Sequence, residues 1–384
     1  MPCKKCGFDF HPYCPKGIAS CQCQFCNSVI ENNSENFAYR SERLFNRMRL
    51  VRNKSGYDCV VPLKGDAEDY FIVSLLLKNK INPLLTLCNS YFLNDIGWHN
   101  IHNLITTFDV DSRFFNPNLN SYREFVSHTL RRVLDPKLPF RMLSYRFAFE
   151  TAYNNKIPYV IHGTCGPAYY AGKFPATMPL RLSRWWTEEH DMAGSNLEMI
   201  INSGAQLSDD FSNNYLFPER KVTRKVSGIF LSNYMKWRHL KNNLTALQYG
   251  FLPEIQTSTF DCLENAGCSI HYNLHDLLRI KKYNAGKGRD HSRVLQAYHN
   301  SNADYWVETK SILSNVKLFF NKFLESSKSG YDWYYENKLK NTVANLDVFN
   351  ETQCDKFKLP TWLSKSFELA VEPEEVYIFF KKGI

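Results

Sequence analysis

The sequence predicts an α/β protein built on a doubly wound parallel sheet. The first observation is a short apolar run, Tyr57 to Leu63, which precedes a polar turn around Gly65 and an amphipathic segment from about Ala67 to Lys80. The second is that the alternation continues, with buried-strand patterns at Pro83 to Cys88 and at Ile157 to His162. Strands that alternate with helices in this way form parallel sheets, and such sheets bind ligands at the carboxyl ends of their strands.

The first turn has the order strand, tight loop and helix N-terminus. This geometry points backbone N–H groups and the positive end of a helix dipole at whatever lies above the sheet edge, most often a phosphate. An ordinary βα turn has the same local pattern, because a single Gly-containing turn is a weak motif. A second glycine-bearing strand end, Gly163 to Gly166, follows the strand at 157–162. We therefore expect Gly65 and the 163–166 segment to form opposite walls of one pocket.

The remaining elements follow from periodicity. The expected helices are Asp95 to Phe108, about Ser121 to Val133, about Leu143 to Asn154 and Tyr305 to Leu324. A basic amphipathic helix is expected around Arg43 to Arg52. Short strands are expected near Arg113 to Phe115 and from Gly228, and the second of these ends in the polar residues Ser232 and Asn233. The segment Arg184 to Asp191 mixes aromatic and charged residues, as sugar sites do, but a helix that packs both of its Trp residues into the core is the favoured interpretation.

Composition restricts the class of protein only broadly. The chain has 384 residues, is 44% hydrophobic with 28 Phe and 22 Tyr, and has a net charge of +9. Such a mild positive charge suits an anionic small substrate as well as nucleic acid, and it also suits simple solvation. No run approaches the roughly 18 apolar residues of a membrane span, and the N-terminus has no signal-peptide core. The expectation is a soluble, cytoplasmic protein without a membrane span.

The cysteines gather at the N-terminus, where six of the twelve lie in the first 26 residues. Cys3 and Cys6 form one Cys-x-x-Cys knuckle and Cys23 and Cys26 a second, and the loop between them has zinc-ribbon length. We predict a structural zinc site, since four thiolates leave no open position for chemistry. A disulfide cluster is the competing interpretation. Three further residues are alternative ligands for one position: His11, Cys14 and Cys21.

Taken together, these motifs resemble the N-acetyl sugar amidotransferase family of PP-loop ATP pyrophosphatases, which serves lipopolysaccharide O-antigen and pseudaminic acid biosynthesis. The resemblance runs from Cys3 to roughly Lys338. Its specific parts are the paired knuckles, the loop at Lys64 to Asp69, the segment Asn273 to Asp276, and the glycine-rich cationic loop Gly286 to His291.

The loop departs from the family pattern Ser-Gly-Gly-x-Asp-Ser. In the same frame this chain has Lys64-Gly65-Asp66-Ala67-Glu68-Asp69, so only Gly65 matches outright and Glu68 is a longer carboxylate at the Asp position. Loss of the second Gly removes the residue that lets backbone approach phosphate most closely. Asp66 adds negative charge near the expected pyrophosphate, which is unfavourable unless Mg²⁺ intervenes. Lys64 can offset that charge as a phosphate-binding cation.

The resemblance implies a reaction that forms AMP and pyrophosphate and converts an acetamido group into an acetamidino group. The implied cofactors and substrates are structural zinc, ATP, Mg²⁺ and an N-acetylated sugar; the implied partners are a glutamine-hydrolysing amidotransferase subunit and a cyclase-like subunit that supply ammonia. ATP binding is assigned to the residues Lys64, Gly65, Asp66, Ala67, Glu68, Asp69, Gly163 and Gly166. Catalysis is assigned to Lys64, Glu68, Asp69, Lys287, Arg289, Asp290 and His291.

The expected domain organisation is a zinc module at 1–40, a PP-loop ATP pyrophosphatase α/β domain at 41–225, and a mainly α region for substrate and partner binding at 226–384. Two other functions are open. One is a tRNA-modifying enzyme of the thiolation type, which needs a strongly basic face and a reactive cysteine, and which the weak net charge opposes. The other is a non-catalytic scaffold that uses the altered loop to dock an ammonia-supplying partner.

Overall fold

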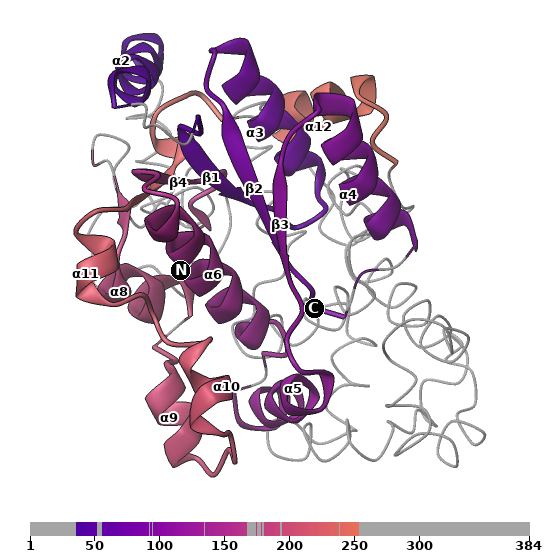
Figure 1. The fold of residues 1–384 in the computed structure, drawn as a ribbon, viewed down its shortest axis with the longest axis vertical. Helices are drawn as coiled ribbons and strands as arrows, with labels where there is room; N and C mark the ends of the chain where they lie inside the picture. The colour runs from indigo at the N-terminus through magenta and orange to yellow at the C-terminus, as the bar shows by residue number, and fades with distance from the viewer. Residues whose placement is uncertain are drawn as a thin grey trace, which may run out of the picture.

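The protein contains a six-stranded sheet with the strand order β3-β2-β1-β4-β6-β5 (Figure 1). The structure, a computed structural model, describes residues 36–51 and 56–252, apart from 92, 94, 134, 167–173, 175–177, 179, 193 and 238. The strands are β1 (Cys59–Pro62), β2 (Pro83–Cys88), β3 (Ser112–Phe115), β4 (Tyr159–His162), β5 (Arg181–Leu182) and β6 (Ser227–Phe230). All neighbouring pairs are parallel except β5 and β6. The predicted parallel α/β sheet is confirmed.

The helices lie on both faces of this sheet, as Figure 1 shows for α3, α4 and α12 on one side and α6 on the other. The longer helices are α2 (Phe37–Leu50), α3 (Ala67–Lys78), α4 (Asp95–Phe108), α5 (Leu119–Val133), α6 (Leu138–Asn154) and α12 (His239–Gln248). The short ones are α8 (Arg184–Trp186), the π-helical turn η1 (Thr187–Asp191), α9 (Leu197–Asn202), α10 (Asp209–Asn213), α11 (Arg220–Thr223) and the 3-10 turn η2 (Leu231–Asn233).

The alternation of side chains along β1 divides the core into two layers. Cys59 and Val61 face the layer that holds α2, α3, α4 and α12, whereas Val60 faces the layer built on α6. All three side chains are fully buried. A strand buried on both faces needs a continuous apolar run instead of an alternating one, and burial of each such side chain contributes about 1.5–3 kcal/mol.

The strand order reverses between β1 and β4. β1 pairs with β2 on one side and with β4 on the other, so the chain builds the sheet outward in both directions from this point. In open α/β sheets, the loops that follow two such strands diverge and leave a crevice at the carboxyl edge. The loops at 63–66 and 163–166 are the two that begin there.

The sheet layer continues past residue 225, the limit expected for the α/β domain. β6 pairs with β4, and α12 packs against α3. The buried side chain of Asn100 on α4 holds the end of this unit, because its amide donates to the Leu252 carbonyl at 2.9 Å and accepts the Leu252 N–H at 2.8 Å. The sheet-containing unit therefore extends to at least residue 252.

Two expectations about the helices need correction. Of the adjacent tryptophans expected to pack together in the core, Trp186 is buried but Trp185 is 57% exposed, because the helix turn that carries them has only one face against the sheet. α6 begins at Leu138 rather than near Leu143, since Pro139 fits the first turn of a helix, where no N–H is needed.

Other expectations lie outside the described residues. These are the cysteine module at 3–26, the segment at 273–276, the cationic loop at 286–291 and the helix at 305–324. Within the part of the chain that the structure describes, no helix is both long and apolar enough to cross a membrane.

Gly228 allows β6, β5 and α6 to approach closely. A Cβ atom at this position would lie 2.7 Å from Cβ of Leu182 and 2.8 Å from Cζ of Phe149. We predict that Gly228→Ala lowers the free energy of unfolding by about 1–3 kcal/mol, because the extra methyl overpacks the core. Gly166→Ala is the matched control, since nothing lies within 4 Å of its Cβ position. Urea unfolding of both variants checks this, and equal stabilities would contradict it.

Candidate functional site

The loop between β1 and α3 turns sharply at Gly65, whose φ is +84°. A side chain is strained at this angle, which explains the glycine. The next residue, Asp66, has an extended backbone and is the N-cap of α3, a 12-residue helix. The loop thus places the backbone N–H groups of residues 64–66 at the amino end of a helix, directly above the carboxyl end of β1.

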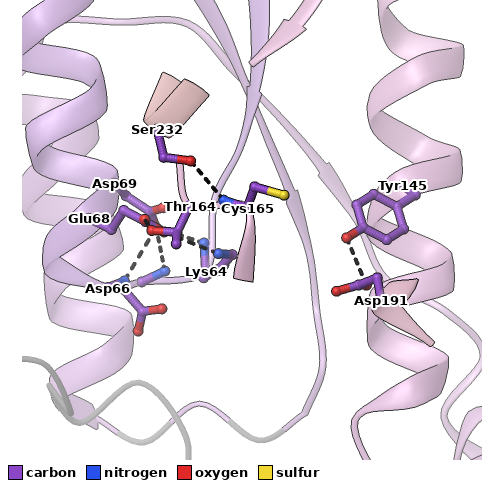
Figure 2. A network of polar contacts seen from close by, with 10 residues as sticks. Lys64, Asp66, Glu68, Asp69, Tyr145, Thr164, Cys165, Asp191 and Ser232 are labelled. Atoms are coloured by element: carbon purple, nitrogen blue, oxygen red, sulfur yellow. Dashed lines mark hydrogen bonds and ion pairs between the residues drawn. The ribbon is translucent and has the colours of Figure 1, made fainter. Parts of the chain in front are cut away.

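Those three N–H groups converge on one oxygen atom. Oδ2 of Asp69 accepts hydrogen bonds from the backbone N–H of Lys64 at 2.7 Å, of Gly65 at 2.8 Å and of Asp66 at 3.3 Å (Figure 2). Asp69 is 1% exposed. The loop therefore has the donor geometry of an anion site, and in this structure the anion is a carboxylate of the chain itself.

Burial and charge both affect the ionisation of Asp69. Removal from water, together with the nearby negative charge of Asp66, raises its pKa to about 7, although Lys64 opposes this shift through its ammonium charge and its N–H. Protonation of Asp69 near neutral pH would weaken its hold on the loop, because a neutral carboxyl group is a poorer acceptor than a carboxylate.

Glu68 links the loop to the segment that follows β4. Its carboxylate accepts a hydrogen bond from the hydroxyl of Thr164 and forms an ion pair with Nζ of Lys64 at 3.3 Å. The carboxylate also lies over Gly163, where a Cβ atom would come within 2.5 Å of Oε1 of Glu68. A side chain at residue 163 would clash with the Glu68 carboxylate, which explains the glycine.

The cation of the site is Lys64, whose side chain is 44% exposed. Packing of neighbouring atoms by itself lowers its pKa, but the negative charges of Glu68, Asp66 and Asp69 outweigh this effect, and the net pKa is raised. Lys64 is thus charged at neutral pH and is accessible to an anion from solvent.

His162, the last residue of β4, is the neutral counterpart. Its Nε2 is buried and has no hydrogen-bond partner among the described residues, and its ring lies against Tyr145 and Phe230. Burial, aided by the charge of Lys64, lowers its pKa to about 3. His162 is therefore an uncharged imidazole at neutral pH.

Ser232 holds the segment at 163–166, which follows β4, in place. Its N–H donates to the Gly163 carbonyl at 3.1 Å, and its hydroxyl accepts the N–H of Cys165 at 2.9 Å (Figure 2). The segment after β4 is thus tied to the turn after β6, so three strand ends contribute to one edge.

The structure brings together the predicted loop residues and Gly163, whereas a side chain at Gly166 would meet no described atom within 4 Å. The assignment of these residues to ATP binding stays a prediction. Sequence reasoning missed Thr164 and His162; the available signal was that both are polar residues at the carboxyl end of a predicted strand.

Mg²⁺ suits the carboxylates of this edge. The ion is usually bound by one or two carboxylates together with substrate phosphates, and Asp66 and Glu68 are the carboxylates beside the loop that would hold it. A closed metal site is a different matter: the described residues contain no cluster of three or more His, Cys, Asp or Glu side chains.

The cysteines of the sheet are unsuited to nucleophilic work. Cys59 and Cys88 are buried, and burial raises the pKa of both thiols. Reactive cysteines need a lowered pKa and access to solvent. Neither residue therefore meets the requirement of a thiolation-type enzyme.

No protein-family model matches the sequence, and no curated protein matches it. Among solved structures, the chain is similar to an NMN synthetase from Francisella tularensis at 13% sequence identity and a TM-score of 0.27, with 54% of this chain and 97% of that chain covered.

Asp69→Ser should free the three loop N–H groups and remove a negative charge. We predict that it tightens the binding of Mg²⁺-pyrophosphate by about tenfold, because each released donor can then take a phosphate oxygen. Without ligand the variant should melt at a lower temperature than the wild type, since buried donors lose their acceptor. Calorimetric titration and thermal melts measure both effects.

Asp209→Ser is the control for that experiment, since it removes an exposed carboxylate from the first turn of another helix. It should leave pyrophosphate affinity unchanged. Unchanged or weaker binding by Asp69→Ser would show that the carboxylate does not occupy the anion position.

His162 should make stability depend on pH. Its folded pKa of about 3 lies below the unfolded value near 6.5, so the unfolded chain binds the proton first and stability falls as pH drops from about 6.5 toward 3. His162→Phe, which suits the aromatic surroundings, removes this contribution. The wild type should lose stability relative to the variant by at most about 1.4 kcal/mol per pH unit below 6. Urea unfolding between pH 4 and 7.5 tests this, and a constant difference would refute it.

Proposed function

We propose that the protein is an ATP pyrophosphatase that converts the acetamido group of an N-acetylated sugar into an acetamidino group, in the biosynthesis of surface polysaccharide or of a pseudaminic acid glycan. The observation that carries the nucleotide part is the convergence of three backbone N–H groups at the head of α3, where the strand order reverses. Support for the sugar and for amidation is the sequence resemblance described above.

The reaction begins with the carbonyl oxygen of the acetamide, which attacks the α-phosphorus of ATP. The P–O bond to the leaving group breaks, pyrophosphate departs, and an O-adenylyl imidate remains. Ammonia then adds to the imidate carbon, and AMP leaves with the former carbonyl oxygen. The product is an acetamidine, and one oxygen of the sugar has been replaced by NH.

This chemistry needs positioning and charge neutralisation more than a nucleophilic side chain. The N–H groups of residues 64–66 would hold the departing pyrophosphate, and Lys64 would neutralise its charge. Asp69 must give up these donors when phosphate enters, and its raised pKa lowers the cost of that exchange. Mg²⁺ held by Asp66 and Glu68 would screen the carboxylates from the phosphates.

The rest of the proposal concerns the residues outside the described part of the chain. Lys287, Arg289, Asp290 and His291 would complete the active site. Zinc bound by Cys3, Cys6, Cys23 and Cys26 would stabilise the N-terminal module. Ammonia would come from a glutamine-hydrolysing subunit through a cyclase-like subunit.

The test is pyrophosphate release from Mg²⁺-ATP with ammonium present, over a panel of N-acetylated nucleotide sugars and nonulosonic acids, with mass spectrometry of each sugar. We expect equal amounts of pyrophosphate and AMP, together with the exchange of one oxygen for NH. Lys64→Ala should lower the rate by about a hundredfold, because it removes a cation from the developing phosphate charge. Lys78→Ala, which removes a cation from the last turn of α3, the helix that follows the loop, should retain the rate.

Two results would overturn the proposal. If no sugar on the panel yields pyrophosphate and ATP fails to bind even to Asp69→Ser, the loop is not a nucleotide site and a scaffold role replaces the enzymatic one. If the protein instead binds tRNA with a steep dependence on salt and releases pyrophosphate only in its presence, the tRNA-modifying function is correct.

A further inference from the structure

A second concave region lies apart from the loop. It is a cavity of about 890 Å³ between α6, the β5–β6 edge of the sheet and the short helices from α8 to α11. Neither the loop at 64–69 nor the segment at 163–166 is among the described residues that line it. The volume lies within the range of small-molecule sites.

Positive charge is prominent in the wall of this cavity. Four arginines line it: Arg146, Arg181, Arg184 and Arg220. Three glutamates also line it: Glu188, Glu198 and Glu219. Two of these glutamates already have cationic partners, since Glu188 pairs with Arg184 at 2.8 Å and Glu219 pairs with Lys221, which lies outside the wall, at 3.0 Å.

The arginines of the wall that have no ion-pair partner among the described residues favour the binding of an anion. Arg181 and Arg220 form no ion pair with any described residue, whereas Glu198 is the one glutamate of the wall in the same condition. Arg146 is 13% exposed and pairs with Glu150 at 2.5 Å, but its Nε is buried without an acceptor among the described residues. Guanidinium groups with free donors bind carboxylates and phosphates in preference to other groups.

Neutral hydrogen-bonding capacity is also unused in the wall. The hydroxyl of Thr187 is buried and has no hydrogen-bond partner in the described part of the chain. Buried hydroxyls are normally satisfied, so each such group calls for a partner. Thr187 opens the π-helical turn η1, and π-helical turns occur frequently at functional sites.

Tyr145 joins the cavity to the strand-edge site. It lines the cavity, its hydroxyl donates to Asp191 of η1 at 2.9 Å, and its ring contacts His162 at the end of β4. Figure 2 shows Tyr145 and Asp191 set to one side of the cluster around Lys64. A ligand in the cavity would therefore touch a residue that packs directly against the candidate nucleotide site.

We propose that this cavity binds a small hydroxylated anion, a sugar-sized molecule with one carboxylate or phosphate group. Arg181 and Arg220 bind the anionic group, and the hydroxyl of Thr187 binds the hydroxylated body. The anionic requirement follows from the wall alone, and only the choice of N-acetylated sugars as probes rests on the proposed function.

The experiment is calorimetric titration of the full chain, without ATP or Mg²⁺, with three probes. N-acetylglucosamine 1-phosphate presents a phosphate, N-acetylneuraminic acid presents a carboxylate, and N-acetylglucosamine has no charge. We expect one of the charged probes to bind and the uncharged one not to bind. Arg181→Ala and Arg220→Ala should each weaken that binding by about tenfold, because each removes charge-assisted hydrogen bonds.

Arg224→Ala is the matched control, since Arg224 follows α11 directly but does not line the cavity, and its variant should bind like the wild type. Thr187→Val tests the hydroxyl at nearly constant shape and should also weaken binding. The proposal is overturned if all three probes bind equally, if neither charged probe binds, or if binding survives both arginine variants but is lost in Lys64→Ala. The last outcome would place the anion on the loop at 64–69. Failure of ATP turnover would change none of these binding results, so the two proposals can fail independently.

Discussion

The contact between the Asp69 carboxylate and the N–H groups of residues 64–66 determines the shape of the edge on which the candidate site lies. A helix N-terminus leaves donors that must be satisfied, and their burial without an acceptor is costly. One carboxylate in the first turn of α3 satisfies three such donors at once, namely the N–H of the N-cap residue Asp66 and the N–H groups of Lys64 and Gly65 in the loop before it. The same contact keeps Gly65 in its left-handed conformation and holds the loop in the form that a phosphate would need. Under the proposed function, phosphate binding would exchange one anion for another, and its free energy would be a difference between two occupied states.

The segment at 163–166, after β4, depends on the loop at 64–69 through Glu68. The Glu68 carboxylate lies over Gly163 and accepts a hydrogen bond from the Thr164 hydroxyl. A change in the loop at residues 64–69 would therefore alter the packing at the end of β4. Ser232 extends this dependence to the turn after β6. Lys64 pairs with Glu68 within the cluster, and burial, aided by the charge of Lys64, leaves His162 beside it neutral. The edge is thus a connected polar network in which Asp69 holds the donors of the loop, and Glu68 and Ser232 join the ends of different strands. Leaving part of such a network without hydrogen-bond partners is costly.

The cavity beside α6 has a different physical character. Its wall holds more arginines than the glutamates that pair with them, and a buried hydroxyl, that of Thr187, with no partner among the described residues, whereas in the loop cluster Lys64 pairs with Glu68. Tyr145 is packed between the two regions, so occupancy of one can influence the other through the His162 ring. The two proposals together, with a nucleotide in one region and a second anion in the other, would describe a protein that brings two charged substrates to one sheet.

Local sequence determined the elements of this protein and their order. The predicted bounds of β2 and α4 agree with the structure, because apolar runs and helical periodicity are properties of neighbouring residues. The same holds for the position of the glycine turn after β1. Tertiary structure alone decided the rest. The two-residue strand β5 has no periodic signal and exists because β6 offers an edge. Trp185 and Trp186 look alike in sequence, yet only one meets the core. Glu68 and Thr164 are 96 residues apart, and their hydrogen bond forms because the sheet places β1 beside β4.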